Sequence, residues 1–228
     1  MANFNTHFVA GTVVTGMGAS LCYAAQLSSL PLSLCLWALG TLGSLLPDVD
    51  SDNSMVLKWL FNGLALIAVA FALFWLAPKL NLIQLWSTLA CIFALVRFPL
   101  MTVFQKFSRH RGIFHSLLAV LFVGALSACF GHRVLQQSAI VCWLAGGFVG
   151  GGYLVHLILD ECYSVDLSNT KIKRSFGTAL KPFSMKYMGQ SLLMAMLAAG
   201  LFWMGPPLEK PWLMIAGSLT TYFRTAWV

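Results

Sequence analysis

The sequence predicts an all-α protein, a polytopic membrane helix bundle with about seven to eight transmembrane spans and a His/Asp cluster at its cytoplasmic face. Of its 228 residues, 59% are hydrophobic and only 9% are charged, whereas a soluble domain carries about 25% charged residues. Apolar runs of membrane-spanning length follow one another along the chain. The few histidine and acidic residues gather at the ends of these runs, which predicts a site there.

Each span can be placed because a helix needs about 20 apolar residues to cross the hydrocarbon core. We expect a short eighth span at about 211–225, after seven spans at 8–26, 31–47, 57–77, 82–104, 113–131, 138–160 and 191–205. Pro47 ends the second span, since the residue before a proline avoids the α conformation. The long connection 161–190 carries five Lys/Arg residues and is expected to fold over the cytoplasmic face. The spans form a single membrane domain, 1–228.

Basic residues are distributed unevenly over the loops. If the spans alternate, the N-terminus and the loops at 48–56, 105–112 and 161–190 share one side of the membrane. That side carries ten basic residues, which are Lys58, Lys106, Arg109, Arg111, Lys171, Lys173, Arg174, Lys181, Lys186 and Arg224. The other side carries three, which are Lys79, Arg133 and Lys210. Because basic loops stay in the cytoplasm, the N-terminal side is predicted to be cytoplasmic.

The net charge of +7 is accounted for by these loops. No compact basic domain remains for nucleic-acid binding, so no nucleic-acid partner is expected. No cleavable signal peptide is expected either, because no Lys or Arg precedes the first apolar run. The bilayer itself is the expected partner.

The sixth predicted span contains the stretch AGGFVGGGYLVH. Gly146 and Gly150 are four residues apart, as are Gly147 and Gly151, so each pair shares a helix face. Small residues at this spacing allow helix backbones to approach closely within a membrane. We therefore expect neighbouring helices to pack tightly against the span that carries His156.

The stretch LLPDVDSDN places two carboxylates directly after a span. Asp48 and Asp50 would point the same way in an extended chain. Two adjacent carboxylates repel unless a cation lies between them. They are therefore either part of a cation site or an acidic loop that precedes the next helix, and the sequence does not decide between the two.

The stretch GGYLVHLILDECYS ends the sixth predicted span. His156 and Asp160 are four residues apart and share one helix face. They can act as two ligands to one metal ion, or as a histidine hydrogen-bonded to a carboxylate inside the bundle. Ionisable residues at membrane depth are usually functional.

The stretch SRHRGIFHS lies at a junction between a loop and a helix. His110 and His115 are five residues apart, which suits one histidine on the loop and one at the first helical turn. Arg109 and Arg111 beside them either orient the protein in the membrane or hold an anionic substrate.

Seven histidine and aspartate residues are thus placed at span ends on one side. This ligand set suits zinc, and manganese or iron as well. Because seven ligands exceed what one zinc ion needs, two or three ions can be held. The predicted ligands are His7, Asp48, Asp50, His110, His115, His156 and Asp160. His132 falls on the other side, and Arg97 either extends to the interface or faces a buried anion.

The blocks LLPDVD, HRGIFHSLL and GYLVHLILDE resemble three signature blocks of the YdjM-type inner-membrane proteins. The resemblance covers residues 7–185 and implies a metal-dependent hydrolase site in a helical bundle of the inner membrane. More distantly, the ligand types are similar to those of zinc-dependent phospholipases C and P1-type nucleases. Ser51 stands where many members have His, and Phe114 where many have Thr, which puts the metal count in doubt. The stretch 161–183 is similar to one subgroup alone.

The resulting hypothesis is a hydrolase of a phosphate ester, such as a phospholipid or polyprenyl phosphate. The metal ions would bind the phosphate and lower the pKa of a water molecule to about 7. Asp48 or Asp50 would bridge the ions or orient that water. The substrate phosphate would be held through charge-assisted bonds by Arg109, Arg111, Lys173 and Arg174; of these, Arg111 is also a catalytic candidate.

Three other functions are compatible with the sequence, and the first two would use the same residues. A metal- or proton-coupled transporter is disfavoured because its site would lie near the bilayer midplane. An intramembrane metalloprotease is disfavoured because the chain lacks H-E-x-x-H, whose glutamate acts as the base. A membrane scaffold without activity is the third.

Overall fold

The computed structural model describes residues 3–50, 55–103, 113–166, 171–172 and 180–226. These residues form helices joined by turns and short loops, together with the two-residue antiparallel strands β1 (Val165–Asp166) and β2 (Lys171–Ile172). The chain divides into two compact units, where the sequence predicts one membrane domain. The first unit combines Met1–Pro47 with Ile113–Val228, and the second is Asp48–Gly112.

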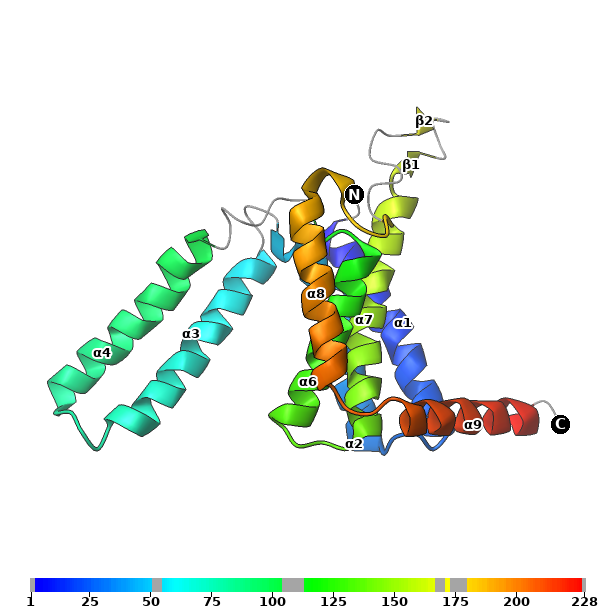
Figure 1. Ribbon diagram of the computed structural model, residues 1–228, viewed down its shortest axis with the longest axis horizontal. Helices are drawn as coiled ribbons and strands as arrows, with labels where there is room; N and C mark the ends of the chain where they lie inside the picture. Colours follow the sequence, from blue (N-terminus) through cyan, green and yellow to red (C-terminus); the bar gives the residue numbers. More distant parts are fainter. Residues whose placement is uncertain (1–2, 51–54, 104–112, 167–170, 173–179, 227–228) are drawn as a thin grey trace. The chain divides into compact units, whose positions relative to one another are not determined.

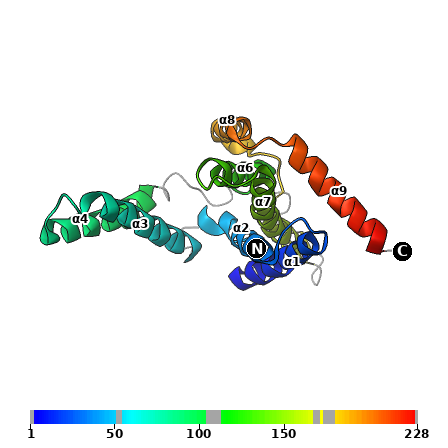
Figure 2. The same cartoon turned by 90° about the horizontal axis from the view of Figure 1, so that it is seen from below.

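The first unit is a bundle centred on α7 (Figures 1 and 2). Helices α1, α2 and α6 pack against α7, and α8 packs against α6. Helices α1 and α6 begin at the end of the bundle where α7 finishes, which is the upper end in Figure 1. The bounds are α1 (Phe4–Ala24), α2 (Leu30–Gly43), α6 (Leu117–Arg133), α7 (Ala139–Cys162) and α8 (Met188–Met204).

Glycines bring α7 into backbone contact with its neighbours. A Cβ atom at Gly152 would collide with the carbonyl group of Gly40 in α2. A Cβ atom at Gly146 would lie 2.5 Å from the carbonyl oxygen of Gly124 in α6. Close helix approach of this kind is the usual role of small residues in membrane bundles.

The two glycine pairs of the sixth span behave differently. Gly146 and Gly150 face α6, as the sequence predicts. Among the described residues, nothing lies within 4 Å of a Cβ atom added at Gly147 or Gly151. The prediction of tight packing is therefore wrong for that pair, which lines an apolar groove instead.

Within the described residues, five helical segments are long and apolar enough to cross a membrane: Leu30–Asp48, Leu57–Leu76, Leu82–Val103, Ala139–Cys162 and Met185–Met204. The helix α6 is apolar but shorter. It begins at Leu117 and not at 113, because Ser116 is extended and its hydroxyl accepts a hydrogen bond from the backbone N–H of Ala119. The structure thus supports a multi-helical membrane protein, and the count of seven to eight spans stays a prediction.

The second unit holds the helices α3 (Met55–Leu76) and α4 (Leu82–Leu95), which pack together. Asn81 caps α4 through a reciprocal pair of hydrogen bonds with Gln84. A π-helical turn, η2 (Val96–Leu100), follows α4 and contains Pro99. Proline has no backbone donor, so a widened turn is a natural place for it.

Arg97 lies in this π-helical turn, and its guanidinium contacts neighbours on the same segment. Its Nη1 atom is 3.1 Å from Met101 Sδ, and its guanidinium carbon is 5.4 Å from the Phe98 ring centroid. The Arg97 side chain therefore contacts residues that are close to it in the sequence.

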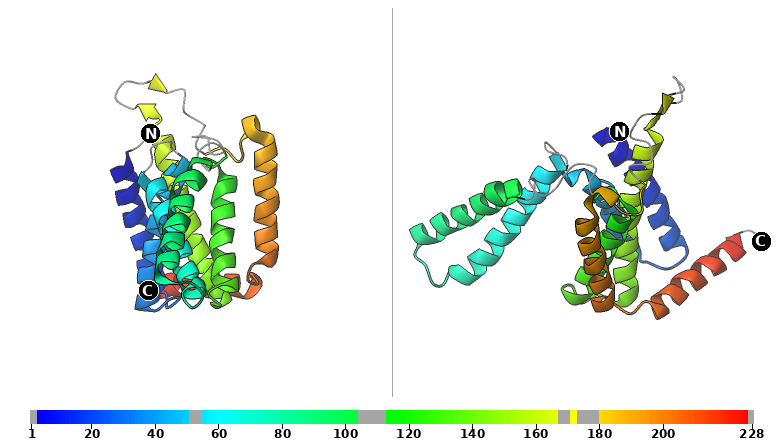
Figure 3. Two further views of the ribbon diagram at one scale, coloured as in Figure 1. Left: turned by 90° about the vertical axis from the view of Figure 1, so that its left-hand side faces the viewer. Right: turned by 45° about the horizontal axis from the view of Figure 1, so that its top comes forward.

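The last helix, α9 (Glu209–Ala226), forms where a short eighth span was predicted. It begins at the lower end of the bundle and is steeply inclined to α6, α7 and α8, and it extends to one side of them (Figures 1 and 2; Figure 3, right). It is also absent from the five segments that are apolar enough to span a membrane.

Changing Gly152 to alanine tests the contact between α2 and α7. The added methyl group meets the Gly40 carbonyl, so we expect a loss of stability of about 1–3 kcal/mol, as for other overpacked sites. Gly147→Ala is the matched control on the same helix and should be neutral or mildly stabilising, because alanine is the better helix former. Thermal unfolding in detergent measures both, and equal effects would contradict the assigned contact.

Candidate metal centre

Four ionisable side chains meet at the end of the first unit where α1 and α6 begin and α7 finishes. They are His7 in the first turns of α1, His115 just before α6, and His156 and Asp160 near the end of α7. Each is at most 1% exposed. Burial of a charged carboxylate is costly unless paired or bound to a cation, so the surroundings of Asp160 decide what this centre can do.

Three imidazole Nε2 atoms surround the carboxylate of Asp160. His7 Nε2 lies 3.4 Å from Oδ1. His115 Nε2 and His156 Nε2 lie 3.7 and 4.0 Å from Oδ2. The His7 and His156 rings are stacked with 3.6 Å between centroids, while His115 meets His156 edge-on.

The shortest of these separations, 3.4 Å between His7 Nε2 and Asp160 Oδ1, equals that of two atoms that share one metal ion, and the other two are longer by a few tenths of an ångström. Ligand bonds of 2.0–2.1 Å in a tetrahedral site place neighbouring ligand atoms about 3.3–3.4 Å apart. A direct N–H···O hydrogen bond would bring the atoms to about 2.7–3.2 Å. Donor atoms of His7, His156 and Asp160 all lie within 4.8 Å of one another. The donor set therefore fits a divalent cation of the zinc, manganese or iron type.

The ring of His156 is oriented by the main chain of α2. His156 Nδ1 is 2.8 Å from the carbonyl oxygen of Ser44. Because a carbonyl oxygen can only accept, Nδ1 carries the proton and donates it. The lone pair of a neutral His156 is then on Nε2, which points toward Asp160, as metal-binding histidines require.

Ser44 joins this contact to α1 as well. Its hydroxyl donates to the carbonyl oxygens of Thr41, at 2.7 Å, and His7, at 3.3 Å. Ser44 is completely buried. One residue at the end of α2 thus fixes the backbone of His7 and the ring of His156.

The segment before α6 is held in place around His115. The hydroxyl of Tyr153 on α7 donates to the carbonyl oxygen of Phe114, at 2.7 Å. The hydroxyl of Ser116 donates to the carbonyl oxygen of Ile113, at 2.6 Å. Since Phe114 contributes its main chain, a threonine in its place could make the same contact.

The long connection after α7 covers the start of α6. The backbone N–H groups of Leu117 and Leu118 donate to the carbonyl oxygens of Lys181 and Pro182, at 2.9 and 3.0 Å. Helix N-termini have unsatisfied N–H groups, and this segment satisfies two of them next to His115.

The remaining predicted site residues lie in η1, in α6 or outside the described part of the chain. Asp48 and Asp50 lie in the 3₁₀ helix η1 (Leu46–Asp50). Asp48 is the first residue of the second unit, so its place among the metal ligands stays a prediction, as does that of Asp50. The predicted residues that lie outside the described part of the chain are Arg109, His110, Arg111, Lys173 and Arg174. His132 lies in the last turn of α6, away from the centre.

Sequence reasoning missed Ser44 and Tyr153. Ser44 acts on His156 through its main-chain carbonyl, for which a sequence carries no signal. Tyr153 lies three residues before His156, on a neighbouring part of the same helix surface. That spacing could have identified Tyr153 as a residue near the metal centre.

Comparison with known proteins gives one match. A protein-family model described as YdjM inner membrane protein matches residues 1–223 of the chain. No curated protein and no solved structure matches it significantly.

Metal analysis of purified protein tests the centre. We expect bound zinc, manganese or iron in the wild type, and its loss in His7→Ala, His156→Ala and Asp160→Ala, because each removes a donor. His132→Ala is the matched control at the other end of α6 and should retain the metal. A wild type that takes up none of these ions would refute the centre.

Proposed function

Because this chain belongs to the YdjM inner membrane protein family, we propose that its buried centre makes it a metal-dependent hydrolase of a phosphate ester in the membrane. The single observation that carries the proposal is the convergence of three imidazole Nε2 atoms on the Asp160 carboxylate, at 3.4–4.0 Å. Such a donor set inside a lipid-embedded bundle suits a lipid-linked substrate, such as a phospholipid or polyprenyl phosphate.

In this proposal, His7, His156 and Asp160, whose donor atoms all lie within 4.8 Å of one another, hold the cation, and His115 lies beside them. A divalent cation bound there would act as a Lewis acid on the phosphate and lower the pKa of a water molecule. Three neutral imidazoles and one carboxylate leave the loaded centre with a net positive charge. That charge attracts an anionic phosphate ester.

The number of donors bears on which ion supports catalysis. Three protein donors leave a tetrahedral zinc ion one open position, as catalytic zinc requires, whereas His115 as a fourth donor would close the site. A six-coordinate ion such as Mn²⁺ or Fe²⁺ would retain open positions in either case. A second ion, held with the help of Asp48, Asp50 and His110, would also supply open positions.

The phosphate itself requires cationic partners. Arg109 and Arg111 precede His115 in the sequence, and Lys173 and Arg174 belong to the connection 161–190, whose residues Lys181 and Pro182 accept hydrogen bonds from the start of α6. We propose that these residues bind the substrate phosphate through charge-assisted hydrogen bonds. Asp48 or Asp50 would orient the attacking water.

A structural metal is the second candidate function, and one observation favours it. All four donors are at most 1% exposed, and closed sites with four protein ligands are typical of structural zinc. A metal ion there would hold the ends of α1, α6 and α7 together and would catalyse no reaction.

Hydrolysis distinguishes the two candidates. The probes are phosphatidic acid and a polyprenyl diphosphate in vesicles with the reconstituted protein, and the readout is released phosphate. We expect phosphate release that a chelator abolishes and that Asp160→Asn lowers by more than the roughly 10–100-fold typical of a residue outside the ligand shell. Cys162→Ser is the matched control, because Cys162 is exposed two residues beyond Asp160, and it should keep both metal and activity.

Two results would overturn the hydrolase. Metal-loaded wild type that releases no phosphate from either probe, but unfolds at a lower temperature once the metal is removed, would favour the structural metal. Unchanged activity in Asp160→Asn would show that the hydrolysis occurs elsewhere.

Orientation is the last part of the proposal. The excess of Lys/Arg residues on the N-terminal side supports the proposal that the centre faces the cytoplasm. A reporter inserted within 167–179 should therefore behave as cytoplasmic, and one inserted at 134–138 should behave as exported. The reverse pattern would overturn the cytoplasmic assignment and leave the metal centre untouched.

A further inference from the structure

The two faces of α9 differ in chemistry. At 100° per residue, one face carries the apolar and aromatic residues Trp212, Ile215, Leu219, Tyr222 and Phe223. The opposite face carries Glu209, Lys210, Thr220, Thr221 and Arg224, with Leu213 and Met214 as its apolar exceptions. Strong segregation at low overall hydrophobicity is typical of helices that lie in a membrane interface.

The dimensions of α9 disfavour a membrane crossing. Lys210 and Arg224 are fourteen residues apart, which is about 21 Å along a helix. The hydrocarbon core is about 30 Å thick. A crossing α9 would place at least one of these charges inside the core, together with Thr220 and Thr221.

The position of α9 in the first unit suits the interface. The helix α8 ends at Met204, and Pro206 and Pro207 follow before α9 begins. Proline cannot continue a helix, so the chain turns there. The helix α9 then extends sideways from the end of the bundle opposite to the one where α7 finishes (Figures 1 and 2).

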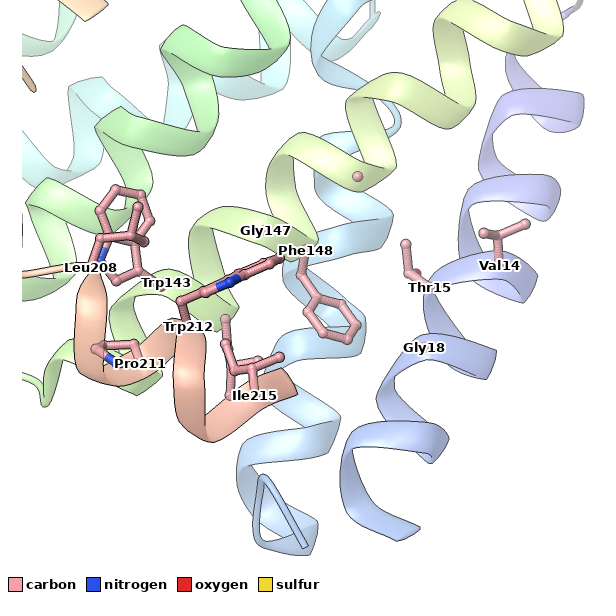
Figure 4. Close-up of a pocket in the computed structure, with 12 residues that line it drawn as sticks. Val14, Thr15, Gly18, Trp143, Gly147, Phe148, Leu208, Pro211, Trp212 and Ile215 are labelled. Carbon is pink, nitrogen blue, oxygen red and sulfur yellow. The ribbon is translucent and has the colours of Figure 1, made fainter. Parts of the chain in front are cut away.

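The apolar face of α9 is continuous with the lipid-facing surface of the bundle. Leu208, Pro211, Trp212 and Ile215 form one side of an apolar groove of about 460 Å³, whose other sides are α1 and α7 (Figure 4). Ile215 also packs against the buried cluster of Cys22, Leu36 and Leu144.

The exposed aromatic residues of α9 continue this apolar surface beyond the groove. Trp212 is 64% and Phe223 is 47% exposed. Aromatic residues at this position are typical of the belt at the level of the lipid headgroups. Bilayer lipid is therefore the partner that covers them.

We propose that α9 is an amphipathic helix that lies in the plane of the membrane interface, at the face opposite the metal centre, and does not cross the bilayer. Its apolar face contacts the acyl chains, and Lys210 and Arg224 remain at the headgroups. The C-terminus then lies on the side opposite the metal centre. Arg224 is then counted on that side. The side of the metal centre keeps nine basic residues and the other side has four, so the proposed cytoplasmic orientation of the centre is unchanged.

Cysteine labelling along α9 tests this. The background replaces the exposed Cys35, Cys91 and Cys162 by serine and keeps the three buried cysteines. Single cysteines are then introduced by Leu219→Cys on the apolar face, and by Thr220→Cys, Thr221→Cys and Thr225→Cys on the polar side. Gln136→Cys, in the loop between α6 and α7, and Tyr163→Cys, after α7, are the references for the two membrane sides. Both reference residues are exposed.

A membrane-impermeant maleimide is applied to sealed vesicles of one orientation. We expect the cysteines at the three threonine positions to be labelled from the same side of the membrane as Gln136→Cys. The cysteine of Leu219→Cys should not be labelled from either side, because it faces the acyl chains. Protection of Thr220→Cys and Thr221→Cys from both sides, or labelling of Thr225→Cys from the side of Tyr163→Cys, would show a crossing helix and overturn the proposal. Equal labelling of all four positions would place α9 in water and overturn it too.

If a cysteine variant does not fold, a second measurement tests the same proposal. A reporter fused after Val228 should match a reporter inserted at 134–138, because both lie on the same side of the membrane. A C-terminal reporter that instead matches one inserted within 167–179 would overturn the proposal.

Discussion

The burial of the Asp160 carboxylate is the constraint on which the rest of this structure depends. A carboxylate in the interior of an apolar bundle is costly unless a partner compensates its charge. Three parts of the chain each bring an imidazole to it: His7 from α1, His115 from the segment before α6, and His156 from α7 itself. The ends of these helices therefore have to meet at one point.

Close helix packing makes that meeting geometrically feasible. The contact of Gly152 with Gly40 brings α2 against α7 just before α2 reaches Ser44. The Ser44 carbonyl can then accept the Nδ1 proton of His156, and its hydroxyl reaches the backbone of His7. Helix packing and ligand orientation are thus coupled, and a methyl group at Gly152 would disturb both.

The two ends of the first unit have different tasks. At one end, four buried donors form a centre whose proposed role is hydrolysis. At the other end, the prolines after α8 turn the chain and α9 presents an apolar face that continues the surface of the bundle. This division accounts for the amphipathic last helix of an apolar chain: the helix is suited to the interface, while the four buried ionisable side chains of the centre lie at the opposite end.

The sequence by itself determined the membrane class, the approximate helices, and the pairing of His156 with Asp160. These follow from local properties: apolar run length, the spacing of four on one helix face, and the scarcity of charge. The sequence also predicted His7 and His115 as ligands, but tertiary structure decided how closely their rings approach Asp160. It likewise decided which glycine pair contacts a neighbour and that Ser44 orients His156 through a main-chain carbonyl. It also decided the direction of α9. These features depend on how separate helices pack, and the distances between atoms on different helices are not encoded in any local pattern.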